Sequence, residues 1–135
     1  MKTYFADTSY RLALELSNDQ NHQTALTHWR NLVKTSFQIV TTSYIFDETV
    51  TYLSSRDHHE KAVEVGENIL LSPTIELVYV DENLFFEGWT LFQKHQDKRY
   101  SLTDCISFVV MKQSKLETAL TFDKHFVQAG FIIEP

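Results

Sequence analysis

Short β-rich segments alternate with helical segments along the whole sequence, and this alternation limits the fold more than any other feature. Strands are predicted over 2–6, 37–42, 74–81, 118–121 and 131–134. Helices are predicted over 8–16, 23–34, 43–54, 57–71, 82–94, 102–112 and 124–129. Because parallel strands need long crossover connections, this order predicts a three-layer α/β/α fold on a central parallel sheet of four to five strands.

Composition narrows the classes of protein that fit this order. The chain has 135 residues, 43% of them hydrophobic, which suits a single domain over 1–135 with a sizeable core. The lone Cys105 lies among apolar neighbours and is expected to be a core residue in a reducing compartment. No signal peptide and no apolar run long enough to span a bilayer is evident, so we expect a soluble, cytoplasmic protein without membrane association.

The net charge of −6 argues against nucleic-acid binding through a general positive potential. Divalent cations held by gathered carboxylates would change this conclusion, because such ions supply positive charge that a residue count does not include. The positions of the acidic residues therefore decide how the charge is interpreted.

Two acidic residues each follow a predicted strand and precede a predicted helix. Asp7 follows the apolar segment TYFA, and Asp123 occupies the same kind of position in ALTFDKHF. Ligands of open α/β sheets bind at the carboxyl ends of strands, which makes both residues candidates for a functional site. Each could equally cap the next helix, since Asp is a preferred N-cap residue, and both interpretations remain open.

Two further acidic residues are predicted on helices. Glu48 shares an apolar helical face with Tyr44, Ile45 and Tyr52, whereas its neighbour Asp47 is assigned to the solvent-facing arc. A buried acid on such a face needs a partner or a metal ion, and the alternative is a Glu48 that is partly exposed or bonded to a tyrosine.

Asp104 sits three residues after Ser101, the spacing of a capping box. It also begins a helix that is apolar nearly all round, so its side chain is expected to point inward. A second capping box is predicted from Asp57 and Glu60 at the start of helix 57–71. In the long helix that follows, the apolar spacing predicts an inward face made of Leu84, Phe85, Trp89, Leu91 and Phe92.

Carboxylates gathered in one pocket repel one another, so the folded site is costly unless cations neutralise it. Mg²⁺ or Mn²⁺ suits oxygen ligands and binds well where a phosphate completes the coordination shell. The chemistry that uses such a site is hydrolysis of phosphodiester bonds.

At these residues the sequence resembles the PIN domain family of metal-dependent ribonucleases, in particular the VapC-like toxins of bacterial toxin–antitoxin modules. Four motifs appear in family order, namely ADTS, FDETVTYL, YSLTDCISF and LTFDKHF. The resemblance implies a PIN-like fold and a catalytic, metal-binding site of Asp7, Glu48, Asp104 and Asp123. It also implies Mg²⁺ or Mn²⁺ as cofactor, endonucleolytic cleavage of RNA, and a supporting hydroxyl from Thr8 or Ser9.

The resemblance implies partners as well: an antitoxin protein that keeps the toxin silent, and a second copy of the chain in a homodimer. The aromatic-rich helices could supply an apolar surface for either partner, although core packing is the commoner use of such residues. The aromatic residues concerned are Trp29, Phe85, Phe86 and Trp89.

Basic residues near the third and fourth motifs are the candidates for contacts with RNA phosphates. They are Lys94, Lys98, Arg99, Lys124 and His125. Surface Lys and Arg in polar loops are commonly only solvated, and this alternative stays open. Four other histidines lack the spacing of metal ligands and are expected to be exposed: His22, His28, His58 and His59.

Two other functions compete with the nuclease. A non-cleaving PIN-like module that binds RNA or protein would have an incomplete set of acidic residues, whereas all four are present here. A receiver-like phosphoacceptor domain would have adjacent acidic residues after the first strand, but Asp7 is followed by Thr8 and Ser9.

Overall fold

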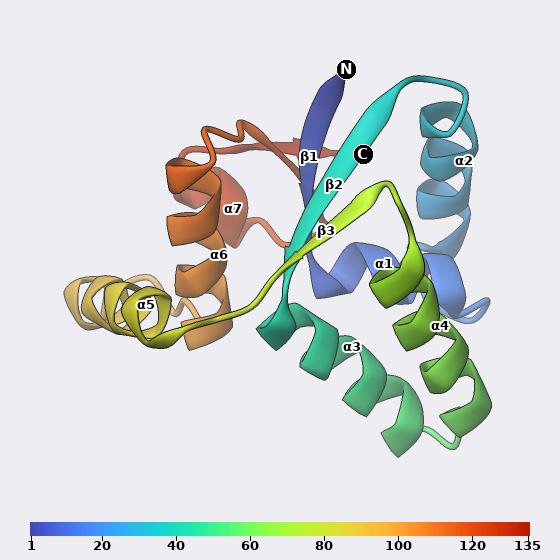
Figure 1. The fold of residues 1–135 in the computed structure, drawn as a ribbon, viewed down its shortest axis with the longest axis horizontal. Helices are drawn as coiled ribbons and strands as arrows, with labels where there is room; N and C mark the ends of the chain where they lie inside the picture. Colours follow the sequence, from blue (N-terminus) through green and yellow to red (C-terminus); the bar gives the residue numbers. More distant parts are fainter.

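The computed structural model describes residues 1–135 and contains one five-stranded, all-parallel sheet in the order β3-β2-β1-β4-β5 (Figure 1). The strands are β1 (Lys2–Ala6), β2 (Phe37–Thr42), β3 (Ile75–Val78), β4 (Thr118–Leu120) and β5 (Ile132–Glu134). The helices are α1 (Thr8–Glu15), α2 (His22–Leu32), α3 (Ser43–Ser55), α4 (His59–Leu71), α5 (Glu82–Lys94), α6 (Leu102–Gln113) and α7 (His125–Gln128). The predicted α/β/α architecture and strand number are confirmed.

Alternation of side chains along the strands divides the core between the two faces of the sheet. Tyr4 and Ile39 pack into a cluster with residues of α1 and α2, whereas Phe5 and Val40 pack into the cluster built with α5, α6 and α7. In Figure 1 these two groups of helices lie on opposite sides of the strands. The buried Cys105 belongs to the α6 side, as expected, and burial raises the pKa of its thiol to about 11.

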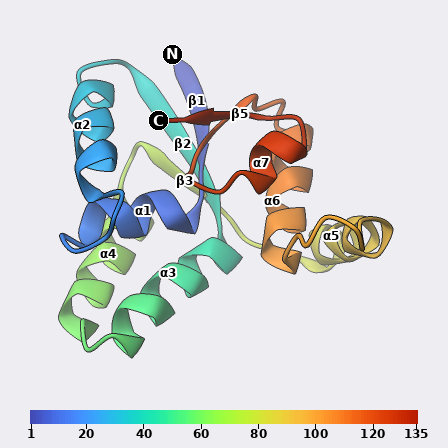
Figure 2. The same ribbon diagram turned by 180° about the vertical axis from the view of Figure 1, so that it is seen from behind.

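The order of the strands creates the position for a site. The chain runs outward from β1 through β2 to β3, then returns to place β4 on the other side of β1. Ala6 pairs with Leu120 at the ends of the two central strands, so the segments that follow β1 and β4 leave the sheet side by side. Figure 2 shows this region from behind, with α7 and the edge strand β5 toward the viewer. Such a reversal of strand order is where open α/β sheets form their ligand crevices.

Helix α5 packs mainly on α6 rather than on the sheet (Figure 1). Gly88 permits this close approach, because a Cβ atom at that position would overlap the side chain of Ile106. Leu84 is buried, but Trp89 is 41% exposed and Phe92 37% exposed, so the prediction that both point inward is wrong. One neighbouring helix covers only a narrow stripe of α5, and its remaining aromatic side chains stay at the surface.

The predicted capping box at the start of α4 is also wrong. Asp57 has a left-handed backbone (φ 61°), and its N–H is bonded to the carbonyl of Ser54 at the end of α3. His58 takes the N-cap position without a side-chain cap bond. The turn that ends α3 therefore determines the conformation of Asp57. The capping pattern considers only the residues that follow Asp57, so it does not predict this effect. None of the helices has the length and apolar character needed to cross a bilayer.

Candidate active site

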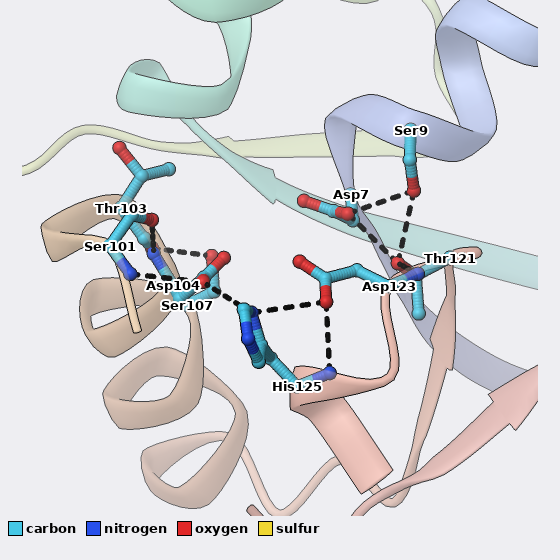
Figure 3. A network of polar contacts seen from close by, with 9 residues as sticks. All are labelled: Asp7, Ser9, Ser101, Thr103, Asp104, Ser107, Thr121, Asp123 and His125. Atoms are coloured by element: carbon cyan, nitrogen blue, oxygen red, sulfur yellow. Dashed lines mark hydrogen bonds and ion pairs between the residues drawn. The ribbon is translucent and has the colours of Figure 1, made fainter. Parts of the chain in front are cut away.

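The four predicted acidic residues, distant in sequence, line one hollow at the carboxyl ends of the central strands. Asp7 follows β1, Asp123 follows β4, Asp104 lies in the first turn of α6, and Glu48 projects from α3. The other lining residues are Thr8, Ser9, Leu12, Arg99, Ser101 and His125. We refer to this set as the acidic hollow. Figure 3 shows three of its carboxylates, those of Asp7, Asp104 and Asp123, around a common space.

Asp7 occupies the N-cap position of α1, but its side chain makes no cap bond. Its Oδ2 instead accepts hydrogen bonds from Thr121 Oγ1 at 2.8 Å and Ser9 Oγ at 3.0 Å. The residue is only 7% exposed, and burial raises the pKa of its carboxyl to about 6 against the lowering effect of both hydroxyls. Of the two interpretations left open by the sequence, the structure favours a carboxylate directed into the site over a helix cap.

Thr121 connects the two strand-end acids and was not among the predicted site residues. Its fully buried hydroxyl donates to Asp7 and accepts the backbone N–H of Asp123 at 2.9 Å. Ser9 Oγ lies 3.1 Å from the same hydroxyl and accepts the N–H of Phe122 at 3.0 Å. These bonds link the segment after β1 to the segment after β4 (Figure 3). The sequence signal that could have identified Thr121 as a site residue is its hydroxyl, two residues before Asp123 in the fourth motif.

Both predictions for Asp104 are confirmed together. Ser101 Oγ accepts the N–H of Asp104 at 2.9 Å, and Asp104 Oδ2 accepts the N–H of Ser101 at 3.1 Å, which completes the capping box. The side chain is nevertheless buried at the edge of the hollow. Burial raises the pKa of its carboxyl, and the negative charge of Asp123 adds to the effect against the bonds from Ser101.

Glu48 lies at the more open side of the hollow and is exposed, so the structure favours the exposed alternative over an acid buried on an apolar face. Its Oε1 accepts the hydroxyl of Thr8 at 2.8 Å. Partial loss of solvent raises the pKa of its carboxyl, with further contributions from the charges of Asp104 and Asp47. Asp47 faces solvent as predicted and bonds to Thr51 one turn further along α3.

His125 lies between two of the carboxylates, a placement that the sequence did not predict. Its Nδ1 is 3.1 Å from Asp123 Oδ1 and 3.4 Å from Asp104 Oδ2 (Figure 3). Its backbone N–H donates to the same Asp123 oxygen at 2.9 Å, and its ring meets the ring of Tyr100 edge-on. Three potential metal ligands therefore meet at Asp104, Asp123 and His125.

The remaining basic candidates divide into two groups. Arg99 lines the acidic hollow from a loop position with a left-handed backbone (φ 57°). Lys94, Lys98 and Lys124 are exposed and do not line it, and Lys98 forms an ion pair with Asp97.

The four histidines expected to be exposed also divide. His58 and His59 are exposed as predicted. His22 is half-buried and bonded to the carbonyl of Ala13, and His28 is half-buried between Tyr10 and Glu134, so the prediction is wrong for these two. In both cases a polar partner on another helix or strand accounts for the burial.

The donor set fits a hard or borderline divalent cation. Four carboxylates provide the oxygen ligands that Mg²⁺ and Mn²⁺ prefer. The buried Nδ1 of His125 has no hydrogen-bond partner even though two carboxylates lie close to it. Arg99 and His125 are the only basic side chains among the lining residues, too few to balance four carboxylates.

The sequence and the fold of this chain are similar to those of known proteins. The PIN domain model matches residues 4–132. The 23S rRNA-specific endonuclease VapC20 of Mycobacterium tuberculosis is 32% identical over 128 residues, which cover 95% of each protein. The crystal structure of M. tuberculosis VapC20, a sarcin-ricin loop cleaving toxin, has a TM-score of 0.88 at 31% identity, covering 98% of this chain and 99% of that one. VapBC2 from Rickettsia felis, bound to a DNA fragment of its promoter, shares the fold with a TM-score of 0.69 at 17% identity, covering 98% and 97%.

Proposed function

The chain belongs to the PIN domain family, and from this premise we propose that it is a metal-dependent endoribonuclease that acts as the toxin of a toxin–antitoxin pair. One observation carries the proposal: Asp7, Glu48, Asp104 and Asp123 line a single hollow where the strand order reverses. Each of them comes from a different segment of the chain, which local capping would not require.

In this proposal the four carboxylates hold Mg²⁺ or Mn²⁺. A bound cation would lower the pKa of an attacking water and stabilise negative charge at phosphorus. The chain's own contribution is to fix the donors: Thr121 and Ser9 orient Asp7, and the capping box with Ser101 orients Asp104. Hydrogen bonds of this kind keep the carboxylate oxygens in place before the cation binds.

Two residues at the open side of the hollow are placed to meet the substrate. Arg99 can pair with a phosphate beside the scissile bond, because a guanidinium matches phosphate oxygens in a bidentate manner. Glu48 remains open to water and has a raised pKa, so it is suited to accept the proton of the attacking water. Hydrolysis of this type is expected to leave a 5′-phosphate and a 3′-hydroxyl.

The relatives support the choice of RNA and of a protein partner. VapC20 is an endonuclease specific for 23S rRNA, so structured ribosomal RNA is the first substrate to test. The fold that this chain shares with VapBC2 is consistent with an antitoxin as its partner, as the resemblance to VapC-like toxins implies. We further propose a homodimer in the cytoplasm, with Phe86 and Trp89, 54% and 41% exposed, as part of an apolar surface available to a second copy.

The competing functions have less support. A non-cleaving module predicts an incomplete acidic set, whereas four acidic residues share one hollow here. A receiver-like phosphoacceptor needs adjacent acids after the first strand, but the residues after Asp7 are Thr8 and Ser9, whose hydroxyls donate to Glu48 and Asp7.

The experiment that tests the proposal is incubation of the purified protein with total RNA that includes ribosomal RNA, in Mg²⁺, in Mn²⁺ and in EDTA. Asp104→Asn and the surface variant Asp47→Asn are run beside the wild type, and both cut positions and end chemistry are determined. Cleavage by the wild type and Asp47→Asn, absent in EDTA and in Asp104→Asn, is the expected result. Equal cleavage by Asp104→Asn would exclude this mechanism.

A further inference from the structure

We infer that His125 is a nitrogen ligand of the cation held in the acidic hollow, so that this site takes Mn²⁺ in preference to Mg²⁺. The inference rests on the proposed function and adds to the four acidic residues a donor of different chemical character. It concerns a side chain that the sequence suggested for contact with RNA.

The spacing of the donor atoms suits a shared ion. Nδ1 of His125 is 3.1 Å from Asp123 Oδ1 and 3.4 Å from Asp104 Oδ2. Two ligands that are each about 2.1 Å from one ion are about 3.0 Å apart at a right angle and about 3.4 Å apart at a tetrahedral angle. All three donor atoms also lie within 4.8 Å of one another. With small movements of the carboxylate side chains, one cation could therefore contact all three residues while the backbone stays in place.

The hydrogen bonding of His125 points the same way. At 3.1 Å the carboxylate of Asp123 is near enough to accept a hydrogen bond, yet Nδ1 has no such partner, so the oxygen lies well off the N–H direction. A buried nitrogen without a partner is unfavourable, and a cation that contacts its lone pair would remove this cost. If a cation lay along the lone-pair direction of Nδ1, its other ligands would lie to the side of that direction. The carboxylate oxygen of Asp123 lies in such a position.

The imidazole is also held in position before any ligand binds. Its ring packs edge-on against Tyr100, with centroids 5.5 Å apart, and its backbone N–H is bonded to Asp123 at 2.9 Å. Asp104 is fixed independently by the capping box with Ser101. A histidine that only contacted RNA would not need this support inside a group of carboxylates.

The consequence is a preference among cations. Imidazole is a good ligand for transition metals, whereas Mg²⁺ is bound mainly by oxygen ligands and water. Mn²⁺ accepts the same carboxylates and binds imidazole more readily than Mg²⁺ does. Loss of the ring should therefore weaken Mn²⁺ binding more than Mg²⁺ binding.

Pulsed EPR of the full chain loaded with Mn²⁺ tests the inference directly, because a coordinated imidazole gives a ¹⁴N hyperfine coupling. We expect this coupling in the wild type and in His59→Gln, whose imidazole is exposed on α4, and its loss in His125→Gln. By calorimetry, His125→Gln should weaken Mn²⁺ binding by about tenfold or more and Mg²⁺ binding by a smaller factor. Asp104→Asn identifies the signal from this site, since it should abolish tight binding.

The outcomes separate this inference from the proposed function. Wild-type protein that binds Mn²⁺ through Asp104 and cleaves RNA, but shows no ¹⁴N coupling, would overturn the role of His125 and leave the nuclease intact. Coupling that persists in His125→Gln would also overturn it. Protein that binds neither cation and cleaves no RNA would overturn both. The wild-type spectrum needs no variant, so the test stands even if His125→Gln folds poorly.

Discussion

Asp7 and Glu48 carry the same kind of charge at two places in the acidic hollow, and we call each of them, with its hydrogen-bond partners, the deep half and the outer half. The deep half consists of Asp7 with Ser9 and Thr121, at the ends of adjacent central strands. The outer half consists of Glu48 on α3 and Thr8 at the start of α1. Asp7 is buried and held by two hydroxyls, whereas Glu48 is exposed and held by one.

The difference shows how the fold divides its tasks. Parallel strands fix the deep carboxylate, because the backbone register Ala6–Leu120 leaves its neighbours little freedom. A helix surface presents the outer carboxylate, which can adjust to a substrate. We therefore expect the negative charge of Asp7 to be needed for catalysis and to reduce the stability of the fold strongly. The negative charge of Glu48 should reduce stability only slightly.

The largest expected effect is on catalysis in the deep half. Asp7→Asn removes a negative charge from the hollow and should reduce RNA cleavage by about 100- to 1,000-fold, the size of effect seen when one charge-stabilising group is lost. RNA binding, measured by filter retention in Ca²⁺, should be retained. Asp47→Asn, which removes an exposed carboxylate outside the hollow, is the control and should cleave normally. Unchanged cleavage by Asp7→Asn would remove the deep half from the mechanism.

The same substitution should stabilise the fold at neutral pH. Burial raises the pKa of Asp7 from 3.8 to about 6, so the carboxyl binds its proton more tightly in the folded state than in the unfolded state. Wild-type stability should then decrease as the pH rises from about 4 to about 6, by up to about 3 kcal/mol. The amide introduced by Asp7→Asn does not ionise, so the variant avoids this loss.

Urea unfolding in EDTA at pH 4 and pH 8 measures the effect. Asp7→Asn should exceed the wild type at pH 8 by much more than at pH 4, whereas Asp47→Asn should stay within about 0.5 kcal/mol of the wild type at both. An equal difference at the two pH values would mean that the charge of Asp7 costs the fold nothing.

The deep half was also the easier half to predict from the sequence. The position of Asp7 after one predicted strand and of Asp123 after another is enough to predict that both lie at one edge of a parallel sheet. Strand order brings β1 next to β4, and the alternation of strands and helices predicts parallel strands without giving this order. Thr121 was missed because its role depends on that adjacency.

Residues on helices were predicted less well. The periodic pattern placed Glu48 on an apolar face, but the depth to which a face is covered depends on which elements pack against it. Trp89 is exposed for the same reason, since α5 contacts mainly α6. Asp57 failed as a cap because the preceding turn requires a left-handed backbone there.

A smaller change in stability is expected when a hydroxyl is removed from either half. Thr121→Val keeps the shape of the side chain but removes the buried bond to Asp7 and the acceptor for the N–H of Asp123. It should destabilise the fold by about 1–3 kcal/mol, the cost of leaving buried polar groups unpaired. Thr8→Val removes a bond at the exposed Glu48 and should cost less than about 1 kcal/mol. Thermal or urea unfolding at pH 8 distinguishes them, and equal losses would contradict a distinction between the halves.

The smallest effect on stability is expected from Glu48→Gln in the outer half. Glutamine keeps the acceptor for the Thr8 hydroxyl and removes a charge that solvent already screens, so unfolding free energy should change by less than about 0.5 kcal/mol. Because the pKa of Glu48 is raised in the folded state, any gain should appear as the pH rises above the ordinary range of a Glu carboxyl. RNA cleavage should nevertheless fall by at least about 100-fold if Glu48 accepts the proton of the attacking water. Glu48→Gln would then change activity without changing stability, whereas Asp7→Asn changes both. A large change in stability in Glu48→Gln would show that the outer carboxylate is as constrained as the deep one.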